Sequence, residues 1–168
     1  MYKKTDKLVN KMTAVAIENN HIKLEHYNQH NVKRGLRNRN GTGVLVGLTK
    51  VACVLGYTYE DGKKVPKEGK LLYRGIPLKD LANGFQREKR YGFEETVFLL
   101  LFGYLPTLDE LTNFTQVLGE NRELPEGFTE NMILKIPSKD IMNKIQRSIL
   151  VLYSHDKDPD NVEISNLL

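Results

Sequence analysis

Residues 93–111 read FEETVFLLLFGYLPTLDEL and carry the strongest helical signals in the chain. The run from Phe93 to Phe102 is apolar on nearly every side after its first turn, which predicts a helix buried in a core. Gly103 follows at the position where helices often end in the left-handed conformation. Thr107 and Glu110 have the spacing of a capping box, so we expect a second helix to begin there.

The flanking segments extend this helical pattern in both directions. Residues 3–31 contain neither Gly nor Pro and predict one or two helices. Pro125 and Gly127 open a short helix that ends near Pro137, and Ser138 is a suitable N-cap for the next helix. The helix expected over Ser138–Tyr153 carries one apolar stripe, formed by Ile141, Ile145, Ile149 and Leu152.

Residues 35–75 differ from the rest because eight glycines divide them into short pieces. The runs 44–46, 51–55, 57–59 and 71–73 are β-prone, and Glu60-Asp61-Gly62 is a good hairpin turn. We therefore expect a small antiparallel β element near residues 43–74 within a mainly α fold.

Composition restricts the class of protein. The chain has 168 residues, of which 40% are hydrophobic and 27% charged, so it is neither a disordered tail nor a membrane span. No apolar h-region follows Met1, so no secretory signal is expected. The single Cys53 cannot close an intrachain disulfide, and a cytoplasmic location is the default expectation.

Charge is distributed unevenly along the chain. Residues 1–91 contain 19 Lys and Arg against 8 Asp and Glu, whereas residues 92–168 contain 6 against 13. The basic half indicates an anionic partner, which could be a phosphate, a carboxylate or nucleic acid. Its densest cluster comprises Lys33, Arg34, Arg37 and Arg39. No aromatic residue lies between these cations, so a nucleic-acid partner is not favoured over a small anion or a solvent-exposed charged face.

Three other patterns have simpler explanations than a catalytic or metal site. Gly41–Gly47 has the spacing G-x-G-x-x-x-G, which is one residue too long for a dinucleotide loop. His26 and His30 share a helical face, but no other ligand has suitable spacing, so no metal is predicted. Glu94 and Glu95 diverge on a helix and suit the positive end of its dipole.

Two segments resemble the signatures of the citrate synthase family. Residues 69–82, GKLLYRGIPLKDLA, resemble the family pattern G-x-L-x-Y-R-G-x-x-I-x-D-L-A. Residues 93–111 resemble the family pattern F-E-E-x-x-x-L-L-x-G-x-L-P-T-x-x-E-L. Both occur in the family's order and near its spacing, and the resemblance covers about residues 33–160.

The resemblance implies a fold and an activity. Residues 1–34 would form an N-terminal helical segment, and residues 35–168 the N-terminal part of the family's helical large domain. Whole citrate synthases condense acetyl-CoA with oxaloacetate to give citrate and CoA, in the entry step of the tricarboxylic acid cycle. The family's catalytic aspartate and histidines lie C-terminal to this chain, so no catalytic residue is expected here and the chain alone is expected to be inactive.

The same resemblance implies ligands and partners. Arg37 matches an arginine that contacts the phosphates of CoA in some members, whereas Arg34 and Arg39 match no ligand. The helix Ser138–Tyr153 resembles one at the family's homodimer interface. No cofactor is implied, because acetyl-CoA is a substrate, and neither nucleic acid nor a membrane is an expected partner. A 2-methylcitrate synthase or a non-enzymatic interaction domain derived from the fold are the alternatives.

Overall fold

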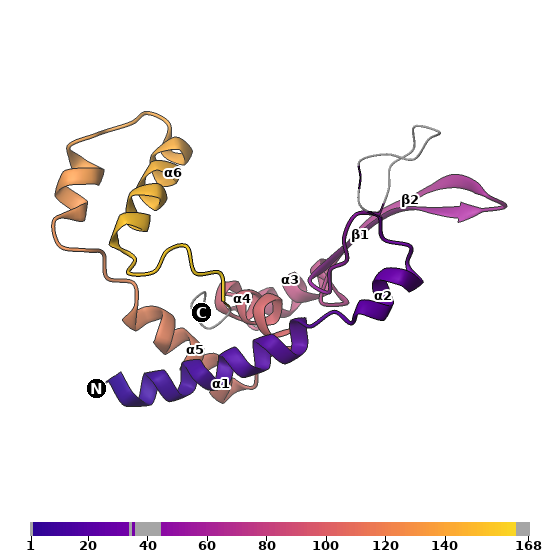
Figure 1. The fold of residues 1–168 in the computed structure, drawn as a ribbon, viewed down its shortest axis with the longest axis horizontal. Helices are drawn as coiled ribbons and strands as arrows, with labels where there is room; N and C mark the ends of the chain where they lie inside the picture. The colour runs from indigo at the N-terminus through magenta and orange to yellow at the C-terminus, as the bar shows by residue number, and fades with distance from the viewer. Residues whose placement is uncertain (1, 34, 36–44, 164–168) are drawn as a thin grey trace. The chain divides into compact units, whose positions relative to one another are not determined.

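The computed structural model describes residues 2–33, 35 and 45–163 (Figure 1). Two compact units are present, an N-terminal unit (Met1–Thr115) and a C-terminal unit (Gln116–Leu168). The elements outside the sheet are α1 (Tyr2–Asn20), α2 (Leu24–Gln29), α3 (Leu78–Arg87), α4 (Phe93–Phe102), α5 (Leu108–Glu120), the π-helix η1 (Thr129–Leu134), α6 (Ile141–Leu152) and the 3-10 helix η2 (Tyr153–His155). This set confirms the mainly α fold.

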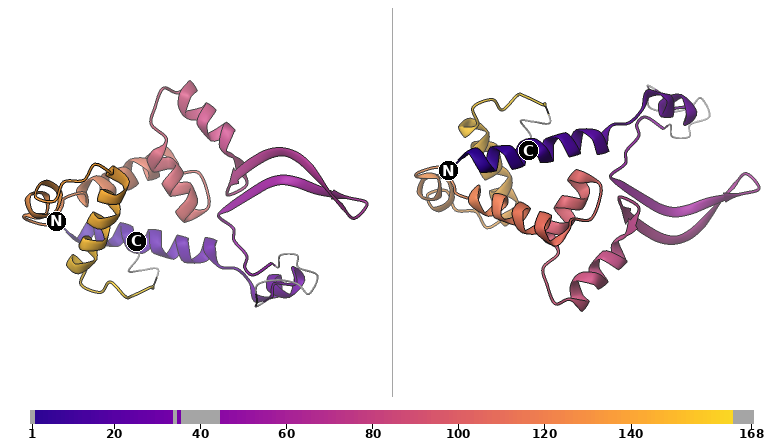
Figure 2. Two further views of the ribbon diagram at one scale, coloured as in Figure 1. Left: turned by 90° about the horizontal axis from the view of Figure 1, so that it is seen from above. Right: turned by 90° about the horizontal axis from the view of Figure 1, so that it is seen from below.

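Helix α1 packs alongside α4 in the N-terminal unit (Figure 2). Thr13 and Ala16 are the buried residues in the described part of α1, and the Thr13 hydroxyl donates to the carbonyl of Val9 at 2.9 Å. The helices expected within residues 3–31 are therefore confirmed as α1 and α2.

The sheet is a long hairpin with a short third strand (Figure 1). Strands β1 (Ala52–Glu60), β2 (Lys63–Tyr73) and β3 (Ile76–Pro77) are antiparallel in the order β1-β2-β3. Asp61 and Gly62 have φ of 50° and 75°, as a tight hairpin turn requires at both central positions. The predicted turn and antiparallel pairing are confirmed.

Among the described residues, the sheet begins later than the sequence indicates. Leu45 and Val46 lie outside any strand, although their side chains suit one, and Val44 lies outside the described residues. A strand needs a partner for its backbone groups, and β1 pairs with β2 only from Ala52 onward. The small antiparallel β element expected near residues 43–74 is therefore confirmed, with its strands over Ala52–Pro77 in the described part of the chain.

An aromatic cluster forms the core of the N-terminal unit. Phe98, Leu99 and Phe102 of α4 are at most 2% exposed, which confirms the buried helix predicted there. The ring of Phe98 lies 4.5 Å from that of Phe102 and 5.5 Å from that of Phe114, measured between centroids. The Phe98–Phe114 pair meets edge to face, an arrangement that ring quadrupoles favour.

The C-terminal unit pairs α6 with η1. Lys144 of α6 donates from Nζ to the carbonyl of Met132, within the π-helix, and to that of Ile136, just after it. These contacts give carbonyls at the end of a short helix a charged donor, which they lack within the helix itself. The short helix expected before Pro137 is therefore confirmed, with π geometry.

Asp140, not Ser138, is the N-cap of α6. The backbone N–H of Asn143 donates to Oδ1 of Asp140 at 3.0 Å, and α6 begins at Ile141. Ser138 instead accepts from the N–H of Asp140 at 3.2 Å, so its hydroxyl orders the turn before the cap. The predicted helix Ser138–Tyr153 is thus shorter at its start than the sequence indicates.

None of the described helices is both long and apolar enough to cross a lipid bilayer.

Candidate functional site

The predicted CoA-phosphate ligand, Arg37, lies outside the described residues, as do Arg34 and Arg39. Lys33 and Leu45 are described, and the N–H of Lys33 donates to the carbonyl of Leu45 at 2.8 Å. The assignment of Arg37 to CoA stays a prediction.

Arg74 joins the two signature segments. It belongs to the sequence 69–82, and its φ of 50° places it in the tight turn between β2 and β3. Its guanidinium donates from Nε at 3.1 Å and from Nη2 at 2.6 Å to the carbonyl of Leu100, in the second signature segment. The forked geometry of arginine allows both bonds to reach one oxygen, which a lysine cannot reproduce.

Two asparagines from α1 complete this contact. Asn19 donates from Nδ2 to the carbonyl of Phe102 at 2.7 Å, and Asn20 donates from Nδ2 to that of Leu101 at 2.8 Å. Asn20 also accepts from Nη2 of Arg74 at 2.5 Å. The three last carbonyls of α4 therefore each receive a side-chain donor from outside the helix; we call Asn19, Asn20 and Arg74 the α4 clamp.

The end of α4 explains why these donors gather there. Gly103 has φ of 86° and its N–H donates to the carbonyl of Leu99 at 2.9 Å, as predicted for a left-handed cap. The preceding carbonyls have no partner within the helix, and the negative end of its dipole attracts a cation. Burial lowers the pKa of Arg74 from its usual value, because desolvation disfavours the charged form.

The capping box of α5 is present as predicted. Oε2 of Glu110 accepts from the N–H and from the hydroxyl of Thr107, each at 2.9 Å, and the N–H of Glu110 donates to the Thr107 hydroxyl at 3.3 Å. The hydroxyl of Tyr104 donates to Oε1 of Glu110 at 2.9 Å. The hydrogen bond from the Thr107 backbone is the main cause that lowers the pKa of Glu110.

Replacing Glu110 with alanine should lower the free energy of unfolding by about 0.5–1 kcal/mol at neutral pH, because it removes the capping bonds. The folded-state pKa of Glu110 lies below the ordinary 4.5, so the carboxylate contributes fully above that pH. The contribution disappears as pH falls through the folded-state pKa. Denaturant titrations of wild type and Glu110→Ala at pH 7 and pH 3 should therefore differ less at pH 3. Asp109→Ala, in the same helical turn, should show a smaller difference at pH 7, and an equal one would contradict the capping role.

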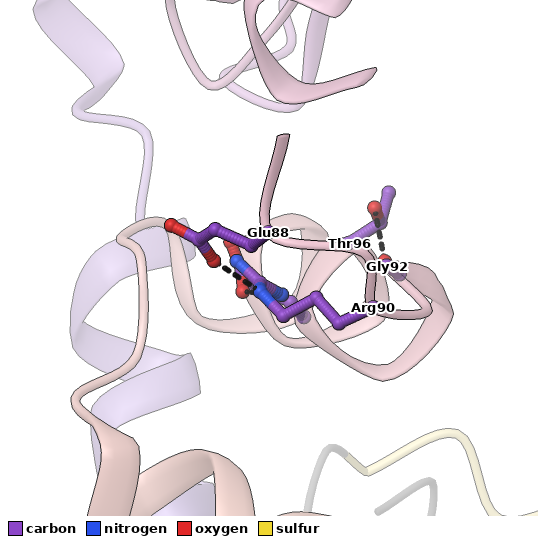
Figure 3. A network of polar contacts seen from close by, with 5 residues as sticks. Glu88, Arg90, Gly92 and Thr96 are labelled. Atoms are coloured by element: carbon purple, nitrogen blue, oxygen red, sulfur yellow. Dashed lines mark hydrogen bonds and ion pairs between the residues drawn. The ribbon is translucent and has the colours of Figure 1, made fainter. Parts of the chain in front are cut away.

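A second polar network lies between α3 and α4 (Figure 3). Arg90 pairs with Glu88 at 2.5 Å and with Glu95 of α4 at 2.5 Å, and its guanidinium lies 5.1 Å from the ring centroid of Phe85. Hydrogen bonds to Glu95 and then Glu88 raise the pKa of Arg90, and the bond to Arg90 lowers the pKa of Glu88. Glu95 thus pairs with an arginine in the first turn of α4 and does not form a carboxylate pair with Glu94.

Gly92 is required in the same network. A Cβ there would overlap the ring of Phe85. The carbonyl of Gly92 accepts from the hydroxyl of Thr96 at 2.7 Å and from its N–H at 3.0 Å (Figure 3). The ring of Phe85 therefore packs against the backbone of Gly92, where α4 begins.

The remaining candidates from the sequence, two histidines, one cysteine and a glycine-rich segment, form no catalytic or metal site within the described residues. His26 lies in α2 and His30 is the residue after it, and no group of three or more His, Cys, Asp or Glu within the described ranges could hold a metal. Cys53 is exposed on β1 opposite Leu72. Of the Gly41–Gly47 segment, only residues 45–47 are described, and they belong to no helix or strand.

The role of Arg74 was missed by reasoning from spacing and periodicity. Its partners Leu100 and Asn20 lie 26 and 54 residues away, so no local pattern marks it. The available signal was its place in the Y-R-G triplet of the first signature segment.

Comparison with known proteins agrees with the signature segments. The family model described as citrate synthase, C-terminal domain, matches residues 41–167. A citrate synthase of Saccharolobus solfataricus is 32% identical over 128 residues, covering 76% of this chain and 28% of that protein. A 2-methylcitrate synthase of Mycobacterium tuberculosis is 31% identical over 131 residues, covering 77% of this chain and 28% of that protein. A citrate synthase of Haloferax volcanii is 35% identical over 96 residues, covering 57% of this chain and 20% of that protein.

The chain thus spans about 28% of the length of the first two of these relatives. The matched residues include both signature segments that the α4 clamp joins. With a family model matched over residues 41–167, the chain belongs to the citrate synthase family.

Proposed function

We propose that this chain is the N-terminal part of a citrate synthase whose full-length form condenses acetyl-CoA with oxaloacetate to give citrate and CoA. The match over residues 41–167 is the observation that supports this proposal most strongly. In such an enzyme the described residues build a scaffold, because the clamp, the capping box and the Arg90 network all fix helix ends. The aspartate and histidines of the reaction would come from chain beyond Leu168, and the reaction would need no cofactor besides its substrates.

The choice of acyl group is the finer part of the proposal. Relatives named citrate synthase and 2-methylcitrate synthase match to a similar extent, at 32% and 31% identity. We favour acetyl-CoA as the substrate, with Arg37 contacting its phosphates, and a cytoplasmic location. Neither a membrane nor nucleic acid has a place in this activity.

A thiol-release assay tests the activity. The 168-residue chain and the complete reading frame are each given oxaloacetate with acetyl-CoA or with propionyl-CoA. We expect CoA release by the longer protein alone and faster with acetyl-CoA. Faster release with propionyl-CoA would make the protein a 2-methylcitrate synthase. No release by the longer protein with either thioester would contradict both and favour a non-enzymatic interaction domain.

We further propose that the full-length protein is a homodimer in which α6 contributes to the interface. The apolar stripe of α6 is open to solvent, with Ile141, Ile145 and Ile149 exposed by 72%, 46% and 60%. Lys144 of the same helix instead binds within its own unit, where it donates to the carbonyls of Met132 in η1 and of Ile136 after it. An exposed apolar stripe of this kind is typical of a surface that another protein covers.

Ile145→Glu in the complete reading frame should weaken the dimer on the order of 100-fold, because it buries an unpaired charge. Sedimentation velocity across a concentration series measures the change. Gln146→Glu adds the same charge to the same helix next to the stripe and should change the dimer dissociation constant by less than about threefold, because an exposed charge stays hydrated. A dimer unaffected by Ile145→Glu would exclude this face from the interface.

A further inference from the structure

A recess of about 330 Å³ opens beside the α4 clamp in the N-terminal unit. Four separate segments contribute to its wall: the end of α1, the residues before β1, the β2–β3 turn and the end of α4. Its lining residues are Asn19, Lys50, Arg74, Gly103 and Tyr104. The charged side chains among them are both cations, and no acidic residue of the described chain lines the recess.

The two cations lack a carboxylate partner among the described residues. The ion pairs found there involve Lys23, Lys67 and Arg90, and none involves Lys50 or Arg74. The neighbouring carboxylate of Glu110 is occupied by Thr107 and by the hydroxyl of Tyr104. Two cations facing one recess repel each other, and an anion between them removes that repulsion.

Arg74 is also held in a fixed position, which favours binding over a mobile surface arginine. Nε and Nη2 are engaged with Leu100 and Asn20, whereas no hydrogen bond within the described part of the chain uses Nη1. A guanidinium restrained through one edge loses little conformational freedom when the rest of it binds an oxyanion. Burial of Arg74 reduces its hydration, so a counter-charge gains more there than on an open surface.

The C-terminus of α4 repels an anion less than most helix C-termini do. Helix C-termini repel anions because their last carbonyls are unpaired. Here the carbonyls of Leu100, Leu101 and Phe102 already receive donors from the clamp. Gly103 has no side chain beside the guanidinium, where a Cβ would lie 3.7 Å from Cζ of Arg74. The space next to the guanidinium is therefore open to a ligand.

We propose that the recess lined by Lys50 and Arg74 binds a small oxyanion, a carboxylate or phosphate group, between the Lys50 ammonium and the outer edge of the Arg74 guanidinium. The site lies on the N-terminal unit and does not depend on the condensation activity proposed above.

Isothermal titration of the 168-residue chain with inorganic phosphate and with succinate, at constant ionic strength, tests this proposal. Either probe should bind saturably with one site per chain, and the probe that binds shows whether a phosphate or a carboxylate is preferred. Lys50→Gln should weaken binding roughly tenfold, as loss of one charged hydrogen bond does, while Lys50→Arg should retain most of it. Lys79→Gln removes the same charge from an exposed position on α3 and should change binding by less than about twofold.

The Nε–H resonance of Arg74 gives a second readout that does not depend on a variant folding. It should shift on addition of the anion, because Nη1 of the same guanidinium binds it. Saturable binding weakened equally by Lys50→Gln and Lys79→Gln would show attraction to overall positive charge and overturn the proposal. An unchanged Arg74 resonance, or no saturable binding of either probe, would overturn it as well.

Discussion

Replacing Phe98 with alanine is expected to lower the free energy of unfolding by about 3–5 kcal/mol, the largest stability loss we predict for a single substitution. Phe98 is 2% exposed and its ring contacts those of Phe102, Tyr104 and Phe114. Truncation removes the buried ring and leaves a cavity that rigid aromatic neighbours cannot fill. Urea titration followed by circular dichroism measures the change.

Phe93 provides the matched control for this substitution. It lies in the same helix and is 69% exposed, so Phe93→Ala removes the same atoms without opening a cavity. Its cost should stay below about 1 kcal/mol. Equal losses for the two variants would show that helix propensity, and not the aromatic cluster, determines the stability of this unit.

Replacing Arg74 with methionine should cost about 2–3 kcal/mol, since it removes charged hydrogen bonds and leaves their acceptors unpaired. The affected acceptors are the carbonyl of Leu100 and Oδ1 of Asn20. Arg74→Lys should recover only part of the loss, because one ammonium cannot reproduce the bonds from Nε and Nη2. Denaturant titration gives the total effect, and amide hydrogen exchange locates it.

The location of the change separates a clamp from a general stabilising charge. In Arg74→Met, exchange should accelerate at the amides of the last turns of α1 and α4, since the clamp joins these two ends. Arg87→Met, an exposed arginine at the end of α3, should leave both turns unchanged. Acceleration confined to the β2–β3 turn would contradict a clamp that reaches α1.

The features that the sequence predicts correctly depend on neighbouring residues. The Gly103 cap, the Thr107–Glu110 box and the Asp61–Gly62 turn each involve residues at most four positions apart. Such patterns determine backbone geometry without information about the rest of the fold.

The element boundaries that differ from the predicted ones share another cause. Ser138 and Asp140 are both residue types that cap helices, and the sequence alone does not say which of them precedes the first turn of α6. Leu45 and Val46 have β-prone side chains, but a strand also needs a paired neighbour, which sequence alone does not supply.

In the candidate site, too, local features could be predicted from the sequence and long-range contacts could not. The resemblance identified the Y-R-G triplet, but the function of Arg74 depends on a carbonyl 26 residues away. The recess beside it combines side chains from four segments between Asn19 and Tyr104. No periodicity or spacing brings such residues together, because their proximity is a consequence of the tertiary fold.

The α4 clamp also has a consequence for synthesis on the ribosome. Asn20 donates to a carbonyl 81 residues further along the chain, and Asn19 to one 83 residues further. At translation rates of roughly 5–20 residues per second, α1 is complete roughly 4–16 s before its partner helix has been made. The first helix to emerge thus spends this interval without its docking surface, and its buried face is then available to chaperones and to neighbouring nascent chains.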